Sequence, residues 1–440
     1  MIKDEDIPEL DTYRRFEKGV PFANRADYEN LVVFGKNDLE PIHNWFKFKE
    51  GYSAKLLSII LSEFADSLPK NELSLLDPYC GSGTTLLSAM TADHLSISAI
   101  GIERNPFIHF VAQTKCSWPT MDHSTLCADG MLALDASREL SIQVPSLSSL
   151  STGRCISRYT TSRLMAVDSV AELFPVNAPF LRLGIAAAVE PLSKVRRDGR
   201  ALRLTDRPRR KINDVLIENW KRMASDVAIL KKEASQFRRP ALHLGDGRNP
   251  AATGVQAKSV DLILTSPPYP NNIDYSEVYK LELWIMRFIQ TSTEFLGLRH
   301  STIRSHPTFN RNAPVNAAFA REVKSGKLKC LLGSVVERLE KSGEHWRSRL
   351  LLGYFSDMWE AIQNYVHLLT RNGIIVLVVG NSLHGTSNPA LIATDLILAQ
   401  IGNCHGLQAR VSVARGLKRR LAGNHFLRES LVILRQPHAV

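Results

Sequence analysis

The sequence has few cysteines and no arrangement of them that is typical of a metal site. Six cysteines are scattered over 440 residues, without a CxxC pair or a short Cys/His cluster. This is typical of reduced, packed thiols in a cytosolic protein, so we expect neither disulfide bonds nor a bound metal. A basic leader with an apolar stretch behind it is also lacking, and the longest apolar run, Ile374 to Val379, is far shorter than the roughly 20 residues that span a bilayer. The sequence therefore predicts a cytoplasmic protein with no membrane segment.

The composition excludes several other classes of protein. Hydrophobic residues make up 44% of the chain and charged residues 22%, near the average for globular proteins, so a disordered chain, a coiled coil and a collagen-like fibre are all excluded. There is no internal repeat and no long low-complexity tract. The unusual feature is a net charge of +11, which indicates a polyanionic partner: nucleic acid first, an anionic membrane surface second.

Four apolar segments have the pattern of buried parallel strands, each followed by a small, polar or glycine-rich loop. A helix is expected over Thr84 to Ala92, directly after a glycine turn. Strand, glycine loop, helix and strand in this order predict an α/β fold with a doubly wound sheet. The four segments are Ser74–Leu76, Ile97–Ile102, Val260–Leu264 and Ile374–Val379.

Two basic stretches interrupt this alternation, one from about Ser117 to Arg239 and one from Phe288 to Leu352. We interpret both as largely helical insertions. A charged run is most often a solvated helix face, but both insertions carry the excess positive charge of the chain. We expect their arginines to contact DNA phosphates: Arg196, Arg197, Arg200, Arg209 and Arg210 in the first insertion, and Arg304 in the second.

The first chemical motif is the loop from Asp77 to Thr85, DPYCGSGTT, at a junction of strand and helix. Glycines there let the backbone approach a ligand closely. The loop is not a phosphate loop, because no lysine precedes its threonine pair, and it lacks the third glycine of a dinucleotide fingerprint. Glu103 follows the next strand, where an acidic residue binds ribose hydroxyls. We therefore expect a ligand that contains a ribose.

The second motif is Ser266-Pro267-Pro268-Tyr269, again at the end of an expected strand. Paired prolines fix the backbone and leave carbonyl oxygens that can only accept hydrogen bonds, which suits the binding of an amine. Tyr269 adds an aromatic face on which a base can stack. A rigid surface turn is the alternative for two prolines alone, but a turn does not explain the glycine loop beside them.

These two motifs resemble the cofactor and catalytic signatures of the S-adenosylmethionine-dependent DNA amino-methyltransferases. Further segments are similar to the same family: His43–Ser53, Gly101–Pro106, Leu244–Arg248 and Asn271–Trp284. The resemblance covers roughly 42–119 and 241–288, with weaker support from 373–435. It implies a Rossmann-like methyltransferase sheet with helices on both faces. It also implies S-adenosylmethionine as cofactor, bound by Phe48, Asp77, Pro78, Gly81, Gly83, Thr84, Glu103 and Asp246.

The resemblance further implies the reaction. In this family, serine in the first position of the second motif is typical of cytosine N4 enzymes. Asp or Asn in that position is typical of adenine N6 enzymes. The Pro-Cys pair of cytosine C5 enzymes is lacking, and Cys80 is better explained as a packed residue. Ser266 and the carbonyl of Pro267 would orient the amine of a flipped cytosine, with Pro268 and Tyr269 completing the catalytic loop. The alternatives are adenine N6 methylation, an RNA amino-methyltransferase and an inactive DNA-binding subunit.

The expected organisation follows the motifs. Residues 1–119 form the N-terminal segment and cofactor half, 120–239 the first insertion, 240–288 the catalytic half, 289–352 the second insertion and 353–440 the end of the sheet. In this family a target-recognition region lies between the two motifs, but here most of the insertion precedes Asp246, so which insertion reads the DNA stays open. We expect double-stranded DNA as substrate and a restriction or defence protein as a possible partner.

Overall fold

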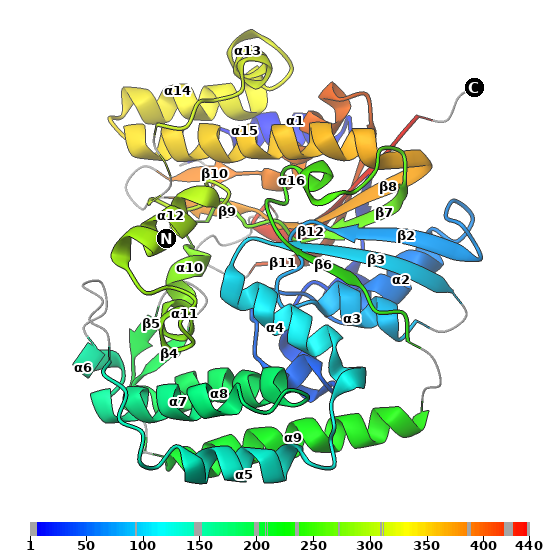
Figure 1. Ribbon diagram of the computed structural model, residues 1–440. Helices are drawn as coiled ribbons and strands as arrows, with labels where there is room; N and C mark the ends of the chain where they lie inside the picture. The colour runs from blue at the N-terminus through cyan, green and yellow to red at the C-terminus, as the bar shows by residue number, and fades with distance from the viewer. Residues whose placement is uncertain are drawn as a thin grey trace.

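An eight-stranded sheet forms the centre of the fold (Figure 1). Its order is β1-β11-β12-β8-β7-β2-β3-β6, and every strand except β12 runs in the same direction. The strands of this sheet are β1 (Phe22–Asn24), β2 (Glu72–Asp77), β3 (Ser96–Glu103), β6 (Ala241–Leu244), β7 (Val260–Thr265), β8 (Leu369–Gly380), β11 (Gln408–Gly416) and β12 (Arg428–Arg435).

The computed structural model describes residues 7–92, 95–144, 152–197, 202–206, 208, 210–233, 237–271, 273–308, 310, 312–384, 389–417 and 426–437. Two antiparallel ribbons accompany the main sheet, β4 (Val195–Arg197) with β5 (Leu202–Leu204) and β9 (Ser382–His384) with β10 (Ala390–Ile392). The α-helices are α1 (Leu10–Glu17), α2 (Leu56–Glu63), α3 (Thr84–Met90), α4 (Pro106–Cys116), α5 (Leu126–Ala136), α6 (Thr152–Cys155), α7 (Arg158–Ala171), α8 (Ala178–Leu192), α9 (Ile212–Glu233), α10 (Tyr275–Val278), α11 (Lys280–Ile285), α12 (Ser292–Ser301), α13 (Ala317–Ser325), α14 (Ser334–Lys341), α15 (His345–Leu368) and α16 (Thr394–Cys404).

The sheet is buried on both faces, which explains why its central strands are continuous apolar runs. Along β8, Ile374, Val376 and Val378 belong to one hydrophobic core, and the alternate Ile375 and Leu377 belong to the other. Helices α3 and α4 cover the first face, and α15 and α16 cover the second (Figure 1). The predicted α/β fold with helices on both faces is confirmed, and the four expected strands are β2, β3, β7 and β8.

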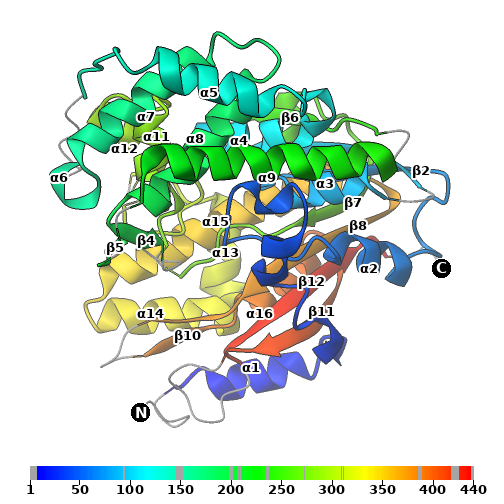
Figure 2. The same ribbon diagram turned by 90° about the horizontal axis from the view of Figure 1, so that it is seen from below.

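The first insertion forms an outer helical layer beneath α4. Figure 2, seen from below, shows α9 lying across its outer side. The layer shares one continuous core with the adjacent face of the sheet, so it is not a separately packed lobe. The indole of Trp220 fills this core between two glycines: a Cβ on Gly130 or on Gly184 would lie 2.4 Å from it. Close packing of this kind joins α5, α8 and α9 into one layer.

Two kinds of feature are absent from the described residues. No helix in these parts of the chain has the length and apolar character needed to cross a membrane. Within the same ranges, no three His, Cys, Asp or Glu side chains come together as metal ligands could.

Candidate active site

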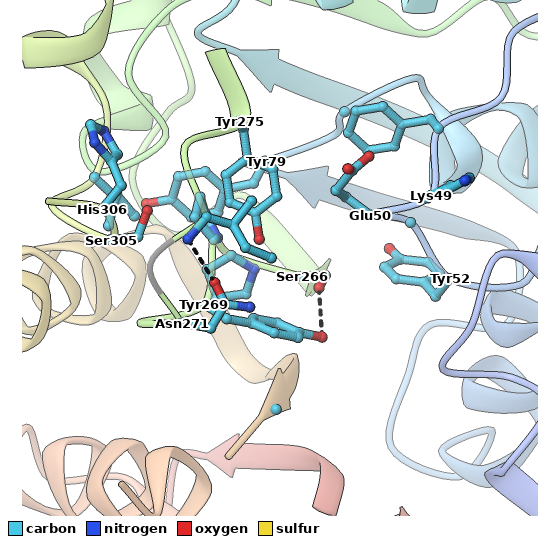
Figure 3. Close-up of a pocket in the computed structure, with 18 of the residues that line it drawn as sticks. Lys49, Glu50, Tyr52, Tyr79, Ser266, Tyr269, Asn271, Tyr275, Ser305 and His306 are labelled. Atoms are coloured by element: carbon cyan, nitrogen blue, oxygen red, sulfur yellow. Dashed lines mark hydrogen bonds between the residues drawn. The ribbon is translucent and has the colours of Figure 1, made fainter. Parts of the chain in front are cut away.

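One cavity of about 1120 Å³ lies at the carboxyl ends of the central strands. In a doubly wound sheet this edge is where ligands bind, because neighbouring strands diverge to opposite crossover connections there. Residues that follow β2, β3, β7 and β8 all line the cavity, among them Asp77, Glu103, Ser266 and Gly380. The two sequence motifs therefore face the same space (Figure 3).

The glycine loop lies between β2 and α3. Gly81 and Gly83 have φ angles of 52° and 86°, in the left-handed region that favours glycine. A Cβ on Gly81 would lie 2.6 Å from the ring of Phe48, so the absence of a side chain lets that ring close over the loop. Phe48 lines the cavity and stacks on Tyr279, with ring centroids 5.6 Å apart. Phe48 and Gly81 thus shape one wall together.

Asp77 is the buried link between the two motifs. Its carboxylate accepts a 2.7 Å hydrogen bond from Thr265 Oγ1 and further bonds from Thr85 Oγ1 and the backbone N–H of Tyr79. Burial raises its pKa to about 6, and these hydrogen bonds oppose the rise. Since Thr265 ends β7 directly before Ser266, Asp77 fixes the glycine loop relative to the Ser266 loop.

Glu103 ends β3 on the cavity wall. It accepts hydrogen bonds from the backbone N–H groups of Gly81, at 3.1 Å, and Asn105, at 2.8 Å. Burial raises its pKa to about 7, although the backbone N–H donors favour the charged form. The carboxyl group is thus held in a fixed orientation at the edge of the glycine loop, with further acceptor capacity on its two oxygens.

Asp246 lies in the loop after β6 and forms an ion pair with Arg248 at 2.6 Å. Burial works to raise its pKa, but the hydrogen bonds and charge of Arg248 outweigh burial, so the pKa lies below the usual value. The neighbouring Gly247 lies against the glycine loop: a Cβ there would be 2.0 Å from the carbonyl oxygen of Pro78. The two loops could not approach so closely with any other residue at 247.

The eight expected cofactor residues do not all reach the cavity. Asp77, Gly81, Thr84, Glu103, Asp246 and Phe48 line it. Pro78 and Gly83 are not among its lining residues. Pro78 supports Gly247 through its carbonyl, and Gly83 packs on Ala112. Cys80 is buried with a strongly raised pKa, which is the environment of a packed thiol and not of a nucleophile.

The Ser266 loop presents one hydroxyl between two partners. Ser266 Oγ lies 3.2 Å from the carbonyl oxygen of Val378 and 3.2 Å from the hydroxyl of Tyr269. A hydroxyl has a single proton, so when Ser266 donates a hydrogen bond to Val378, its oxygen can accept a hydrogen bond from another group. The ring of Tyr269 packs beside Gly380, where a Cβ would lie 3.0 Å from it. Ser266, Pro267, Pro268 and Tyr269 all line the cavity.

The opposite wall contains two histidines that the sequence does not assign to the site. His306 is almost fully buried, and its Nδ1 lies 2.7 Å from Thr308 Oγ1. Burial lowers the pKa of this imidazole, which keeps it neutral. His384 Nε2 donates to the carbonyl of Pro270 at 2.6 Å and so holds the end of the Ser266 loop. Both histidines lie far along the chain from the motifs, and neither has a sequence pattern that could have revealed its position. Figure 3 shows Ser305 beside His306 on one side of the cavity and Asn271 next to Tyr269.

The arginines expected to bind DNA fall into three groups. The structure corrects the prediction for Arg197 and Arg304: both guanidinium groups are buried in ion pairs, Arg197 with Glu282 and Arg304 with Asp357, so neither is presented to DNA. Arg196 and Arg210 are exposed, and Arg210 pairs with Glu218 on the surface. Arg200 and Arg209 lie outside the described residues.

The cavity wall has features that fit a nucleoside-containing cofactor. The glycine loop forms a cradle that a side chain at Gly81 would fill, and Glu103 stands at its edge as an oriented acceptor for ribose hydroxyls. The hydroxyl of Ser82, in the same loop, is buried without a hydrogen-bond partner among the described residues, but Ser82 is not among the residues that line the cavity.

Comparison with known proteins gives relatives of one kind. The chain is 24% identical to the type II methyltransferase M.BsoBI of Geobacillus stearothermophilus over 63% of its own length and 59% of that protein. It is 23% identical to the type II methyltransferase M.AvaI of Nostoc sp. and of Anabaena variabilis, over 92% of its own length and 89% of theirs. The chain is a distant homologue of type II methyltransferases. The match to M.BsoBI covers about three fifths of the length of that protein. No protein-family model and no solved structure matches it.

Proposed function

We propose that this protein is an S-adenosylmethionine-dependent DNA methyltransferase that modifies the exocyclic N4 amine of cytosine. The observation that carries the proposal is the single cavity shared by the glycine loop and the Ser266 loop. The distant homology to type II methyltransferases supports methyl transfer to DNA. We infer that it serves a restriction-modification system in a prokaryotic cytoplasm, with a nuclease as functional partner.

The cofactor would be held by the wall that Phe48, Gly81 and Glu103 form. When bound, it supplies a methyl group whose carbon is made electrophilic by a positive sulfur. Glu103 accepts hydrogen bonds from the ribose hydroxyls, and the ring of Phe48 encloses the cofactor against the glycine loop. These roles match the strand-end positions at which such folds bind ribose and the close backbone approach that glycine allows.

The chemical difficulty lies in the amine. An exocyclic amine on a base is a poor nucleophile because its lone pair is delocalised into the ring. Ser266 Oγ and the carbonyl of Pro267 accept hydrogen bonds from the two amine hydrogens and so turn the lone pair out of conjugation toward the methyl group. The new bond from nitrogen to the methyl carbon would replace the bond from that carbon to sulfur, and the amine would release one proton to solvent. The hydrogen bond from Ser266 to Val378 orients the serine oxygen for this task. No covalent bond to the protein is needed.

The base must leave the duplex to reach the cavity. Flipping a base removes its stacking in the helix, and an aromatic side chain in the pocket replaces part of that loss. Tyr269 lines the cavity directly after the two prolines and provides that ring. The net charge of +11 favours binding to the phosphate backbone that surrounds the flipped nucleotide.

The test is to identify the product. Purified protein is incubated with duplex DNA and cofactor, and the DNA is digested to nucleosides and measured by mass spectrometry. We expect N4-methylcytosine. N6-methyladenine would change the assignment to an adenine enzyme, and methylation of RNA alone would exclude DNA as substrate. Tight DNA binding without any methylated product would indicate an inactive DNA-binding subunit.

A further inference from the structure

The first insertion contains a small β-ribbon at the rim of the cavity. In this ribbon β4 pairs with β5 in an antiparallel register that sets Arg196 opposite Arg203 and Arg197 opposite Leu202. Successive residues of a strand point to opposite faces. The basic run seen in the sequence is therefore divided between two faces, with Arg197 on one and Arg196 and Arg203 on the other.

The face of the ribbon that carries Arg197, here called the inner face, contacts residues next to the candidate active site. The buried guanidinium of Arg197 pairs with Glu282 of α11 and lies 3.3 Å from Glu190. It also lies 5.0 Å from the ring centroid of Phe46 and 4.8 Å from that of Tyr279. The ribbon is thereby attached to the segment that precedes Phe48 and to the helix that follows the Ser266 loop.

A second contact attaches the backbone of the ribbon. Lys49 Nζ donates a 2.7 Å hydrogen bond to the carbonyl oxygen of Arg197, and Val195 on the same inner face is buried. Because Lys49 and Glu50 line the cavity, these contacts fix the ribbon relative to the cavity wall. Figure 1 shows β4 and β5 beside α11 at this end of the molecule.

The outer face carries positive charge at the cavity rim. Arg196 and Arg203 are both exposed, and Arg203 lines the cavity itself. Because Arg196 and Arg203 are paired in the register, their side chains lie on the same face of the ribbon. Arg forms bidentate hydrogen bonds to phosphate.

We propose that Arg196 and Arg203 form a clamp for the DNA backbone at the nucleotide that enters the cavity. This proposal rests on the proposed function and assigns the duplex-binding surface to the rigid ribbon at the rim, not to the helical layer below it. A flipped nucleotide remains joined to its neighbours through its phosphates, which must stay outside the cavity while the base lies inside. Arg203, at the rim, is positioned for those phosphates.

The test compares two double variants in which the net charge falls by the same amount. Arg196→Ala/Arg203→Ala removes the clamp, and Arg321→Ala/Lys324→Ala removes two exposed charges from α13, which Figure 1 places at the opposite end of the molecule. Binding of a short DNA duplex is measured by fluorescence anisotropy at salt concentrations from about 50 to about 200 mM. We expect the clamp variant to bind at least tenfold more weakly, with the salt slope reduced by about 0.9 for each phosphate that the protein no longer neutralises, and the α13 variant to bind like wild type.

The outcomes separate this proposal from the proposed function. If wild type binds DNA and the clamp variant keeps the same affinity and salt slope, the clamp is overturned and the proposed function stands. If wild type fails to bind DNA, both are overturned. Arg196→Lys/Arg203→Lys controls for folding: it preserves the charge but not the bidentate geometry, so its affinity should lie between that of wild type and that of the Ala variant. Equal loss of affinity in the Ala and Lys variants together with a lowered melting temperature would refute a phosphate contact.

Discussion

Thr265 Oγ1 donates a 2.7 Å hydrogen bond to the carboxylate of Asp77, and this bond joins the ends of two adjacent parallel strands. One strand leads into the glycine loop and the other into Ser266. Both partners are buried, so the bond is protected from water and has a fixed geometry. Together with the backbone pairing of β2 with β7, this contact between side chains that are 188 residues apart sets the spacing between the glycine loop and Ser266.

Thr265→Val tests this coupling. The substitution keeps the shape of the side chain but removes the donor, so we expect a loss of about 1–2 kcal/mol in the free energy of unfolding. Both cofactor affinity and turnover should fall, because the glycine loop and the Ser266 loop are no longer held at a fixed distance from each other. Denaturant unfolding and calorimetric titration with cofactor would measure the two effects. Thr265→Ser, which retains the hydroxyl, is the matched control, and equal loss in both variants would contradict the role of the hydrogen bond.

Ser266→Ala tests the chemical step. We expect turnover to fall by about 100-fold, the effect of losing one preorganised polar group at a transition state. Cofactor affinity should change little, because the hydroxyl acts on the amine and not on the cofactor. Single-turnover methylation and calorimetry together would measure this separation. Full activity of the alanine variant would mean that the catalytic loop lies elsewhere.

Tyr269 has two separable parts. Its ring is the proposed stacking surface, and its hydroxyl lies 3.2 Å from Ser266 Oγ. Tyr269→Ala should weaken capture of the base strongly, at about 1–3 kcal/mol per stacked base. Tyr269→Phe retains the ring, so it should recover most of that binding, with a smaller loss of turnover from the freed serine. Measurement of KM for DNA and kcat for both variants distinguishes the two parts; identical values for Phe and Ala would exclude stacking.

Glu103 predicts a pH dependence of cofactor binding. Its pKa of about 7 means that the carboxyl is mostly protonated at about pH 6 and ionised at about pH 8. The ionised form is the stronger hydrogen-bond acceptor, and protonation turns one of its oxygens into a donor, so the Kd for cofactor should decrease as pH rises from about 6 to about 8. Glu103→Gln should bind more weakly across this range and lose most of the dependence. Calorimetry on both sides of the pKa provides the comparison, and a wild-type Kd that is flat over this range would contradict the assignment.

The same pKa shift affects stability in the opposite direction. The folded-state pKa of Glu103 lies above its ordinary value of 4.5. Its contribution to the stability of the cofactor-free protein is therefore complete below about pH 4.5 and is lost as pH rises through about 7. Relative to wild type, the cofactor-free Glu103→Gln protein should gain stability between about pH 5 and about pH 8, which thermal unfolding at these two values would measure.

Arg304 should act on stability and not on DNA binding. Its guanidinium group pairs with Asp357, which also pairs with Arg248 of the Asp246 loop. Arg304→Ala would leave part of the Asp357 charge unpaired, so we expect a loss of about 3 kcal/mol in the free energy of unfolding. The salt slope of DNA binding should stay at the wild-type value. A stable variant with a reduced slope would restore the original interpretation of Arg304 as a phosphate contact.

Local sequence patterns were sufficient to predict the central strands and the motifs at their ends. The runs before Asp77, Glu103 and Ser266 are apolar because both faces of β2, β3 and β7 are covered. A strand buried on both faces can be recognised from its own residues alone. Parallel strands place their carboxyl ends at one edge, so two motifs far apart in the chain could be expected to share a site.

The positions of the charged residues could not be predicted in the same way. Arg196 and Arg197 are adjacent and identical in type, yet one is exposed and the other buried, because the pairing of β4 with β5 and the position of Glu282 decide which face is covered. The partner of Arg304 lies 53 residues away on α15. Ion pairs of this kind have no local periodicity, and a basic run alone cannot reveal them.

The pairing of β1 with β11 affects how the protein can be made. Residues Phe22 to Asn24 align with Val411 to Val413, so β1 has no strand partner until a segment about 390 residues further along has left the ribosome. The segment after β1 supplies Glu29 and Val32 to the cavity wall and continues to Phe48. A premature stop before β11 would therefore yield a protein with both motifs intact but without the strand that pairs with β1, ahead of the segment that leads to Phe48.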